Sequence, residues 1–341
     1  MALPESTSPA MNSELLAILR RLGLGGGQVV RAMSPLTGGV SSDIWRIEFE
    51  DYSICAKRAL SQLKVAAHWE APLSRNAYEY AWFEELGAEF AEHMPRMLGR
   101  DEEAGVFFMS FLEPAQHPVW KQLLLQGQIS PAFARSVGDC LGRMHRHTAR
   151  QDRLARRFKT DAEFFSLRLE PYLLATAQRH PALADRLHRL CAQTAQTQLA
   201  LVHGDISPKN ILCGPQGPVF LDAECAWYGD PAFDLAFCLN HLLLKAVHLP
   251  AQSSALGQSF VQLARAYLDA VDWEPVAAFE RRTAQLLPAL MLARVDGKSP
   301  VEYLTEEGRR EVVRRAATQG LRQPPQQLRE VLDITLKELL L

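Results

Sequence analysis

Polar and turn-forming residues interrupt two short apolar runs in the stretch LVHGDISPKNIL, residues 201–212. Asp205 and Asn210 lie five positions apart in this stretch, and Asp222 and Glu224 follow the next apolar run, in VFLDAECAWYGD. The apolar runs are strand-like, so these side chains would gather at the ends of neighbouring strands. Carboxylate and amide oxygens suit Mg²⁺, which takes few protein ligands and completes its shell with phosphate and water. The pattern therefore predicts a magnesium site on a polar loop.

The spacing of these side chains is the one that kinases use for phosphoryl transfer. In a kinase, an Asp accepts the proton of the attacking hydroxyl, while an Asn five residues later and an Asp after the next strand hold the metal ions. A polar hairpin turn with a carboxylate cap is the better explanation of a lone D-x-x-x-x-N. The combination of Asp205, Asn210 and Asp222 at the spacing found in kinases is far more specific for phosphoryl transfer.

The strings HGDISPKN and LDAECAWYGDPAFDLAF resemble the aminoglycoside phosphotransferase and choline kinase-like superfamily of small-molecule kinases, which share the protein-kinase-like fold. The resemblance covers most of the chain and is strongest in residues 201–237. It implies Asp205 as the catalytic base and Asn210 and Asp222 as magnesium ligands. It also implies that Asp234 is a structural residue bracing the catalytic loop.

The D-x-E pair formed by Asp222 and Glu224, followed by AWYGDPAFD, resembles 5-methylthioribose kinases in particular. Enzymes of that group use both acids at the metal, so the resemblance implies Glu224 as a further ligand. The sequence departs from the group by keeping Asn210 in the loop, and the chain is shorter. These departures leave the acceptor open.

A glycine-containing loop in the first part of the chain is typical of phosphate binding. The stretch LTGGVSSDIWRI, residues 36–47, predicts a strand, a loop and a second strand. Gly38 and Gly39 would let the backbone approach phosphates, and Ser41 and Ser42 could donate hydrogen bonds to them. Any Gly-Gly hairpin has the same appearance, so this loop alone is a weak signal.

Lys57, in SICAKRAL, lies within a predicted strand among small and apolar residues. Burying its ammonium is costly unless an anion meets it, and the α- and β-phosphates of ATP would be that anion. Glu79, in the helix predicted at 74–87, is the expected partner carboxylate. The alternative for Glu79 is a solvated position on the helix surface.

The predicted elements give an α+β chain with a bilobal protein-kinase-like fold: a small N-terminal β-sheet lobe with one inserted helix and a larger, mostly helical C-terminal lobe. We expect residues 1–112 to form the nucleotide-binding lobe and 113–341 the catalytic and acceptor-binding lobe. The connecting stretch FFMSFLEP would hold adenine through backbone groups near Met109 and Phe111. Helices are predicted at 13–22, 74–87, 131–148, 161–198, 231–247, 255–271, 275–293, 305–318 and 325–340, and strands between 28 and 59 and at 105–112, 199–202, 211–213 and 218–221.

Polar residues in otherwise apolar helices of the second lobe are candidates for binding the acceptor: Arg168, His241 and Arg294, together with Trp227 beside the metal motif. The five donors of Arg294 suit a vicinal diol, a carboxylate or a phosphate. The alternative for Arg294 is that it caps its own helix or pairs with Asp296. The other polar groups have the same alternative, a capping or interhelical hydrogen bond.

The expected function is ATP- and Mg²⁺-dependent transfer of the γ-phosphate to a hydroxyl of a small, sugar-like metabolite. The alternatives are a choline- or aminoglycoside-type kinase and a nucleotide-binding pseudokinase. No concentrated acidic patch suits a polycationic aminoglycoside, whereas Trp227 and Tyr228 leave an aromatic cage for choline open. A pseudokinase would be expected to lose Lys57, Asp205, Asn210 or Asp222, and all four are present. No H-R-D, D-F-G or A-P-E set appears, which argues against a protein kinase.

Composition excludes several other classes of protein. The 341 residues, 48% of them hydrophobic, are enough for a well-buried core, and the formal charge of −2 gives no reason to expect nucleic-acid binding. Six scattered cysteines predict free thiols in a reducing cytosol. The N-terminal residues lack the features of a signal peptide, and no apolar run is long enough to span a bilayer. We therefore expect a cytoplasmic protein whose partner is a small-molecule acceptor.

Overall fold

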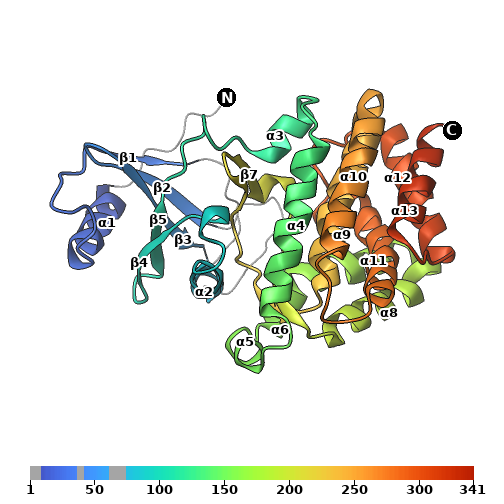
Figure 1. Ribbon diagram of the computed structural model, residues 1–341, viewed down its shortest axis with the longest axis horizontal. Helices are drawn as coiled ribbons and strands as arrows, with labels where there is room; N and C mark the ends of the chain where they lie inside the picture. Colours follow the sequence, from blue (N-terminus) through green and yellow to red (C-terminus); the bar gives the residue numbers. More distant parts are fainter. Residues whose placement is uncertain (1–8, 37–41, 61–73) are drawn as a thin grey trace. The chain divides into compact units, whose positions relative to one another are not determined.

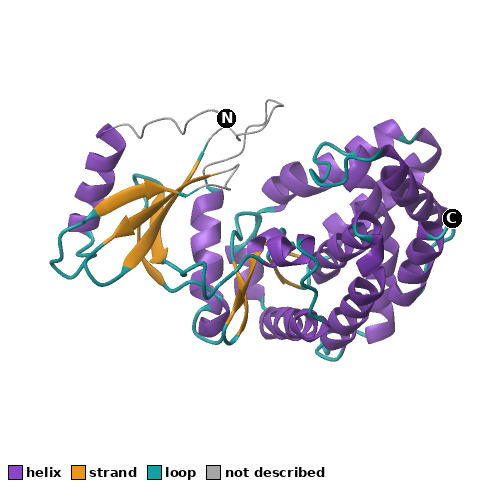
Figure 2. Ribbon diagram, turned by 90° about the horizontal axis from the view of Figure 1, so that it is seen from above, coloured by secondary structure: helices purple, strands orange, loops and turns teal. Residues whose placement is uncertain are grey.

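The computed structural model describes residues 9–36, 42–60 and 74–341. The chain divides into two compact units, Met1–Glu113 and Pro114–Leu341. The first unit is built around a sheet, and the second is mostly helical with two short two-stranded sheets (Figures 1 and 2). This architecture confirms the predicted α+β class.

A five-stranded antiparallel sheet, in the order β1-β2-β3-β5-β4, forms the first unit. Its described elements are α1 (Pro9–Arg21), β1 (Ala32–Pro35), β2 (Ser42–Glu48), β3 (Ser53–Ala59), α2 (Arg75–Leu86), the 3₁₀ turn η1 (Ala91–His93), β4 (Met97–Asp101) and β5 (Val106–Ser110). One helix, α2, is inserted between the strands, and α1 precedes them.

The two faces of this sheet are covered by different helices. Side chains alternate along a strand, so Ala56 and Phe108 face one way, where Ile18 and its apolar neighbours on α1 pack against them. Lys57 and Phe107 are cross-strand partners and face the other way, toward α2. The alternation within β3 therefore places Lys57 on the face opposite the α1 core.

The edge strand β4 was not among the predicted strands. Its sequence, MLGRD, contains a glycine and two charged residues, which are uncommon in strands. It is held only by β5, with a register shift between Met97 and Gly99. Edge strands tolerate such residues because one of their sides has no neighbouring strand.

Helices dominate the second unit. Its elements are α3 (Trp120–Leu125), α4 (Pro131–Thr148), α5 (Asp152–Arg157), α6 (Asp161–Phe164), the π-helix η2 (Phe165–Leu174), α7 (Ala175–Arg179), η3 (Pro181–Leu183), α8 (Ala184–Gln196), β6 (Ala200–Val202), η4 (Pro208–Asn210), β7 (Ile211–Gly214), β8 (Gly217–Phe220), β9 (Trp227–Gly229), α9 (Pro231–His248), η5 (Pro250–Gln252), α10 (Ser253–Leu268), α11 (Val276–Asp296), α12 (Glu307–Arg322) and α13 (Leu328–Leu339). Strand β6 pairs with β9, and β7 pairs with β8.

The core of this unit surrounds α9, whose residues from Pro231 to Val247 are all buried. Helices α10, α11, α12 and α13 contact it (Figure 1). Helix α10 also packs closely on α4, where a Cβ at Gly138 would lie 2.1 Å from the carbonyl oxygen of Leu263. Only glycine allows the two backbones to come this close.

The single long helix predicted at 161–198 is wrong. The structure divides this segment into α6, η2, α7, η3 and α8. Pro171 lies inside the π-helix and Pro181 begins the 3₁₀ turn. Proline lacks an N–H donor and clashes with the preceding turn, so it interrupts regular α-helical hydrogen bonding.

In the described part of the chain, no single helix is both long and apolar enough to cross a membrane. One pair, Pro231–His248 with Pro250–Leu268, meets the requirement together by length and composition only, with a bend of 120°.

Candidate active site

The polar loop that carries Asp205 follows β6 and needs a glycine to turn. Gly204 has φ +78°, and a Cβ there would lie 2.5 Å from the carbonyl oxygen of Cys225. A side chain would therefore be strained and would also collide with the backbone. This turn buries Asp205, which is only 4% exposed.

Asp234, near the start of α9, holds the backbone of this loop. Its carboxylate accepts hydrogen bonds from the backbone N–H groups of His203 (2.7 Å) and Gly204 (2.9 Å). The ring of His145 lies 3.2 Å from the same carboxylate, and its other nitrogen lies 2.5 Å from the Tyr267 hydroxyl. Asp234 is fully buried. These bonds confirm that Asp234 braces the loop.

His203 supports the loop from inside. Its Nδ1 accepts from the backbone N–H of Asp205 (3.2 Å), which assigns the ring proton to Nε2, where it donates to the carbonyl of Leu221 (3.0 Å). Burial lowers the pKa of His203, although nearby Asp234 and Asp205 oppose this effect. A neutral imidazole with a hydrogen bond at each ring nitrogen fits a structural role.

Three donors converge on the carboxylate of Asp205. Arg168 Nη2 lies 3.2 Å from Oδ2, Lys209 Nζ 3.1 Å and Asn210 Nδ2 2.8 Å. Burial would raise the pKa of Asp205, but the charges of Lys209 and Arg168 outweigh burial and lower it. Asp205 is therefore held ionised and oriented, which is the state in which a carboxylate can accept a proton.

Asn210 and Asp222 lie at the same end of the β7–β8 hairpin. Ile211 pairs with Phe220, and the backbone N–H of Leu221 donates to the carbonyl of Asn210 (2.9 Å). Leu221 therefore lies beside Asn210, and Asp222, the next residue, lies at the same end of the hairpin. Its φ is +68°, a conformation that costs a non-glycine residue energy and is concentrated at functional sites.

The oxygens of this hairpin end fit a Mg²⁺ ion that is shared with phosphate. Throughout the described ranges, no group of three or more His, Cys, Asp or Glu side chains could by itself hold a metal. Asn210 and Asp222 supply an amide and a carboxylate oxygen, the donor set of a cation that keeps water and phosphate in its shell. Glu224, two residues after Asp222, is half-buried, and its assignment to the metal stays a prediction.

Lys57 and Glu79 form a buried ion pair in the first unit. Lys57 Nζ lies 2.7 Å from Glu79 Oε1, and both side chains are about 2% exposed. The Asn76 amide also donates to the backbone carbonyl of Lys57 (3.4 Å). Glu79 is thus not the solvated surface residue that the alternative required. The Lys57 cation is positioned by the fold, as a phosphate ligand must be.

The structure describes only some of the other residues predicted to bind the nucleotide. Gly38, Gly39 and Ser41 lie outside the described residues. Ser42 begins β2 and is buried. Met109 lies in β5, paired with both β3 and β4, and Phe111 follows that strand beneath the guanidinium of Arg46.

Two of the predicted acceptor residues have roles within the fold. Arg168, on the π-helix, donates to the carbonyl of Gly204 (2.5 Å) and pairs with Asp205, so it orders the loop. Trp227 is stacked on Phe164, and its indole N–H donates to Asp161 (2.9 Å). Trp227 is 1% exposed, which leaves no ring face for an acceptor.

His241 lies in the second half of α9, and Arg294 lies near the end of α11. His241 is buried with its ring against Phe237. Arg294 Nη1 donates to the Ser299 carbonyl and hydroxyl and to the Tyr172 hydroxyl (3.2 Å). Asp296, its proposed alternative partner, pairs instead with Arg314 (2.9 Å) and His180 (2.8 Å). Contact of His241 or Arg294 with an acceptor stays a prediction.

Residues 32–279 match the model of the phosphotransferase enzyme family, APH. The chain belongs to this family. Among curated relatives, methylthioribose kinase from Escherichia coli O45:K1 (strain S88 / ExPEC) is 25% identical over 242 residues, which are 62% of this chain and 57% of the relative. The chain thus spans little more than half the length of that relative. Family and relative together confirm the superfamily resemblance.

Solved structures of other phosphotransferases share the fold. Choline kinase LicA from Streptococcus pneumoniae is 14% identical, with a TM-score of 0.53 over 92% of this chain and 99% of that one. Amicoumacin kinase hAmiN, solved with AMP-PNP, Ca²⁺ and Ami, is 12% identical, with a TM-score of 0.51 over 94% and 98%. These likenesses confirm the predicted kinase-like fold.

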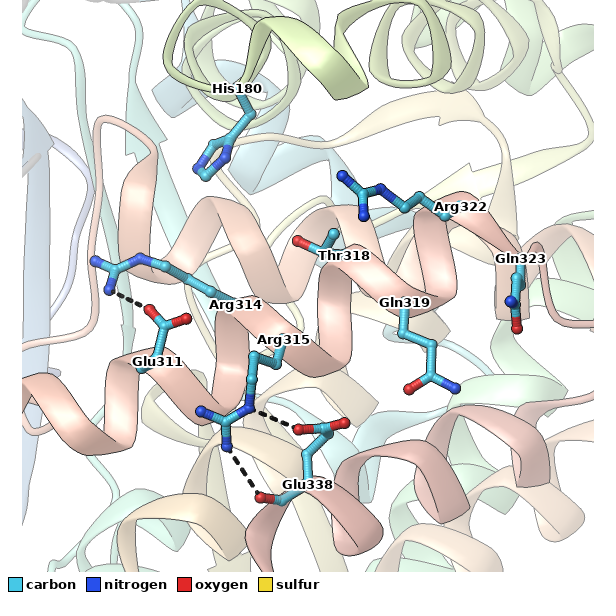
Figure 3. A pocket seen from close by; sticks show the side chains of 9 residues that line it. All are labelled: His180, Glu311, Arg314, Arg315, Thr318, Gln319, Arg322, Gln323 and Glu338. Atoms are coloured by element: carbon cyan, nitrogen blue, oxygen red, sulfur yellow. Dashed lines mark hydrogen bonds and ion pairs between the residues drawn. The ribbon is translucent and has the colours of Figure 1, made fainter. Parts of the chain in front are cut away.

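This phosphotransferase-family chain also has a cavity of about 560 Å³ among α12, α13 and His180 (Figure 3). Its cations are largely neutralised by neighbours: Arg314 pairs with Asp296 and Arg315 with Glu338. None of the residues described above at Asp205 lines it. It is therefore separate from the loop that carries Asp205.

Sequence reasoning missed two polar residues of the phosphotransferase that the structure singles out, Lys245 and Tyr303. Lys245 lies on α9, one turn after His241, and is fully buried. Tyr303 lies between α11 and α12, and its ring centroid is 4.7 Å from Lys245 Nζ. The only sequence signal for Lys245 was its position inside the apolar run FCLNHLLLKAVH. A lysine there resembles the ordinary cation found near a helix C-terminus.

Proposed function

We propose that this protein transfers the γ-phosphate of ATP to a hydroxyl of a small, sugar-like metabolite, with Mg²⁺ as cofactor. The observation that carries the proposal is the buried Asp205 carboxylate, held ionised by three donors in a loop braced by Asp234. The methylthioribose kinase relative supports a small-metabolite acceptor. The AMP-PNP-bound amicoumacin kinase supports ATP as the donor.

In this mechanism the acceptor hydroxyl binds at Asp205, which orients it and accepts its proton. The hydroxyl oxygen forms a bond to the γ-phosphorus as the bond to the ADP oxygen breaks. Lys209, half exposed beside Asp205, would neutralise charge on the transferring phosphoryl group. Mg²⁺, held through Asn210 and Asp222, would supply charge neutralisation on the phosphates.

The first unit would bind the nucleotide. Glu79 fixes the Lys57 ammonium, which would contact the α- and β-phosphates. A fixed, buried cation pays little ordering entropy when the phosphates arrive. We thus propose the nucleotide role for residues 1–112 and the catalytic and acceptor role for residues 113–341.

We also propose the reducing cytoplasm as the protein's compartment. All six cysteines are free thiols, and five are buried. Burial raises the pKa of Cys55 and of Cys140 to about 12. Buried thiols with raised pKa values are unreactive, as expected of structural cysteines.

The test is ADP release from ATP·Mg²⁺ over a panel of hydroxylated metabolites, with choline and kanamycin included. We expect release that depends on one class of uncharged or anionic polyol and disappears without Mg²⁺. ATP binding in a thermal-shift assay without turnover on any compound would favour a nucleotide-binding pseudokinase instead. Efficient phosphorylation of choline or kanamycin would overturn the sugar-like acceptor.

A further inference from the structure

A fully buried lysine with no hydrogen-bond partner in the described part of the chain lies on the central helix of the second unit. Lys245 is 0% exposed, and its ammonium nitrogen makes no hydrogen bond to any described residue. The ring of Tyr303 lies against it, with 4.7 Å between Nζ and the ring centroid. A cation–π contact offsets only part of the cost of removing an ammonium from water. When protonated, Lys245 therefore has no anion in hydrogen-bond contact among the described residues.

Two further donors near Lys245 also have no acceptor among the residues that the structure describes. The hydroxyl of Tyr303 and the Nε of Arg294 are both buried without a hydrogen-bond partner. Arg294 is anchored by its Nη1 to Ser299 and Tyr172, so its position is fixed. Buried polar groups are nearly always paired in folded proteins. Three unpaired donors in one region indicate that an acceptor from outside the chain completes them.

The charge balance of this region points to the same kind of ligand. The charges that act on Lys245 include Lys121 and Arg294, which disfavour its protonation, and Glu302, which favours it. Glu302 is already engaged by Lys121 in an ion pair. The cluster of Lys245, Lys121, Arg294 and Glu302 thus contains three basic side chains and one carboxylate. An added anion would favour protonation of Lys245 and would balance the excess of basic groups, which an added cation would not.

Helix α9 connects this cluster to the loop of Asp205, because Asp234 near its start holds that loop and Lys245 lies further along the same helix. Asp234, His241 and Lys245 are spaced by seven and four residues, so they share one face of the helix. Lys209 of the catalytic loop and Lys245 both act on the pKa of His241, which burial lowers most. The rise from His241 to Lys245 is about 6 Å. Lys209 of the loop and Lys245 therefore both lie within electrostatic range of His241.

We propose that Lys245, Tyr303 and Arg294 bind an oxyanion, a carboxylate or a phosphate ester, carried by the acceptor whose hydroxyl is phosphorylated. This inference rests on the proposed function and deepens it, because it makes the acceptor an anion rather than a neutral sugar or an amino alcohol. The segment 297–306 between α11 and α12 carries Tyr303 and contains no helix or strand. A shift of this segment would admit the anionic group to Lys245.

The first experiment measures anion binding without catalysis. The melting temperature of the whole protein is recorded with millimolar sodium sulfate and with sodium chloride at equal ionic strength, for the wild type, Lys245→Met and Lys298→Met. Lys298 is an exposed lysine of the same segment that pairs with Glu170 (2.6 Å), so its removal is the matched control. We expect sulfate to stabilise the wild type and Lys298→Met beyond chloride, and Lys245→Met to lose at least half of that shift. An equal response of all three proteins, or no specific response in the wild type, would overturn the site.

The second experiment tests whether the anion belongs to the acceptor. Hydroxy acids and sugar phosphates are compared with their amides and parent sugars in the ADP-release assay, which separates a carboxylate from a phosphate ester. Lys245→Met should raise the KM of the anionic acceptor about 10- to 100-fold, as expected for a lost hydrogen bond to a charged group, with the KM of ATP unchanged. Tyr303→Phe, which removes one atom and keeps the ring, should raise it less. Preference for the neutral analogues would contradict the inference.

The two experiments separate this inference from the proposed function. If no compound supports ADP release but sulfate binding still depends on Lys245, the kinase proposal fails and the anion site stands. If turnover is efficient and Lys245→Met leaves the KM of the acceptor unchanged, the kinase proposal stands and the anion site fails.

Discussion

The protonation state of Asp205 is the residue-scale basis of the proposed chemistry. Its carboxylate faces Arg168, Lys209 and Asn210, which keep it ionised and in one orientation. An ionised base that is already positioned loses little free energy when the acceptor hydroxyl arrives. The same donors reduce its basicity, so we expect the carboxylate to orient the hydroxyl and to accept its proton only as the bond to phosphorus forms.

Replacement of Asp205 tests this assignment. Asp205→Asn keeps the shape of the side chain but cannot accept the proton, so kcat should fall by about two to four orders of magnitude while ATP binding persists. Asp272→Asn, at an exposed aspartate that pairs with Arg146, is the control and should leave kcat unchanged. Steady-state kinetics with the best acceptor give the comparison. Turnover by Asp205→Asn within a few-fold of the wild type would remove Asp205 from the role.

Lys245 gives a stability prediction that depends on pH. Burial, with Lys121 and Arg294, lowers its pKa from 10.5 to about 7 against the opposing charge of Glu302. Between pH 7 and about 10.5 the unfolded chain therefore holds a proton that the folded chain has released, so this lysine makes wild-type stability rise with pH. Lys245→Met removes that dependence. The variant should be more stable than the wild type at pH 7, and its advantage should shrink toward pH 10.

Urea unfolding of both proteins at pH 7, 8, 9 and 10, without multivalent anions, measures that difference. Titration of the groups that do not interact with Lys245 cancels in the comparison because both proteins contain them. A difference in unfolding free energy that is constant across this range would show that Lys245 keeps its usual pKa.

At this scale the types and spacing of the polar residues were enough to predict a loop held by Asp234. The catalytic role of Asp205 and the metal roles of Asn210 and Asp222 stay predictions. The Lys57–Glu79 pair was also predictable, since a lysine within a strand needs a carboxylate. Lys245 was not, because its burial depends on the helices packed around α9. Nothing in its immediate sequence distinguishes it from a lysine at a solvated helix end.

Secondary-structure elements hold these residues by close contacts that depend on small side chains. Helices α4 and α10 cross where Gly138 meets the backbone of Leu263, and α4 carries His145, which contacts Asp234. The packing of α4 on α10 therefore supports the brace of the catalytic loop. Asp234 connects this helix pair to the loop itself.

Gly138→Ala is the element-scale prediction. The added methyl group would lie 2.1 Å from the carbonyl oxygen of Leu263, so α4 and α10 must move apart. We expect a loss of about 1–3 kcal/mol in the free energy of unfolding, the usual cost of overpacking. Gly308→Ala, at a helical position with no atom within 4 Å, is the control and should be neutral or slightly stabilising. Equal urea midpoints for the two variants would contradict the close approach.

Element prediction succeeded where apolar periodicity was uninterrupted, as in α9, and failed where proline interrupts it, as in residues 161–198. The π-helix around Pro171 turns Arg168 toward the loop, and no local pattern predicts that direction. Strand β9, three residues long, was also missed, because its pairing with β6 is a contact distant in sequence.

At the scale of the whole molecule, the proposal assigns nucleotide binding to the first unit and proton transfer to the second. Lys57→Met should therefore raise the KM of ATP and lower kcat, while the sulfate response that depends on Lys245 persists. Arg31→Met, at an exposed arginine just before β1 that pairs with Glu50, is the control for a lost cation. Loss of the sulfate response in Lys57→Met would show that the two functions are not divided in this way.

The central claim, phosphoryl transfer to an acceptor hydroxyl, is tested most directly by mass spectrometry of the acceptor after incubation with ATP·Mg²⁺. For the wild type, the account predicts an acceptor that has gained one phosphoryl group for each ADP released, and for Asp205→Asn a rate lower by about two to four orders of magnitude. ADP release with an unmodified acceptor, or equal phosphorylation by both proteins, would contradict it.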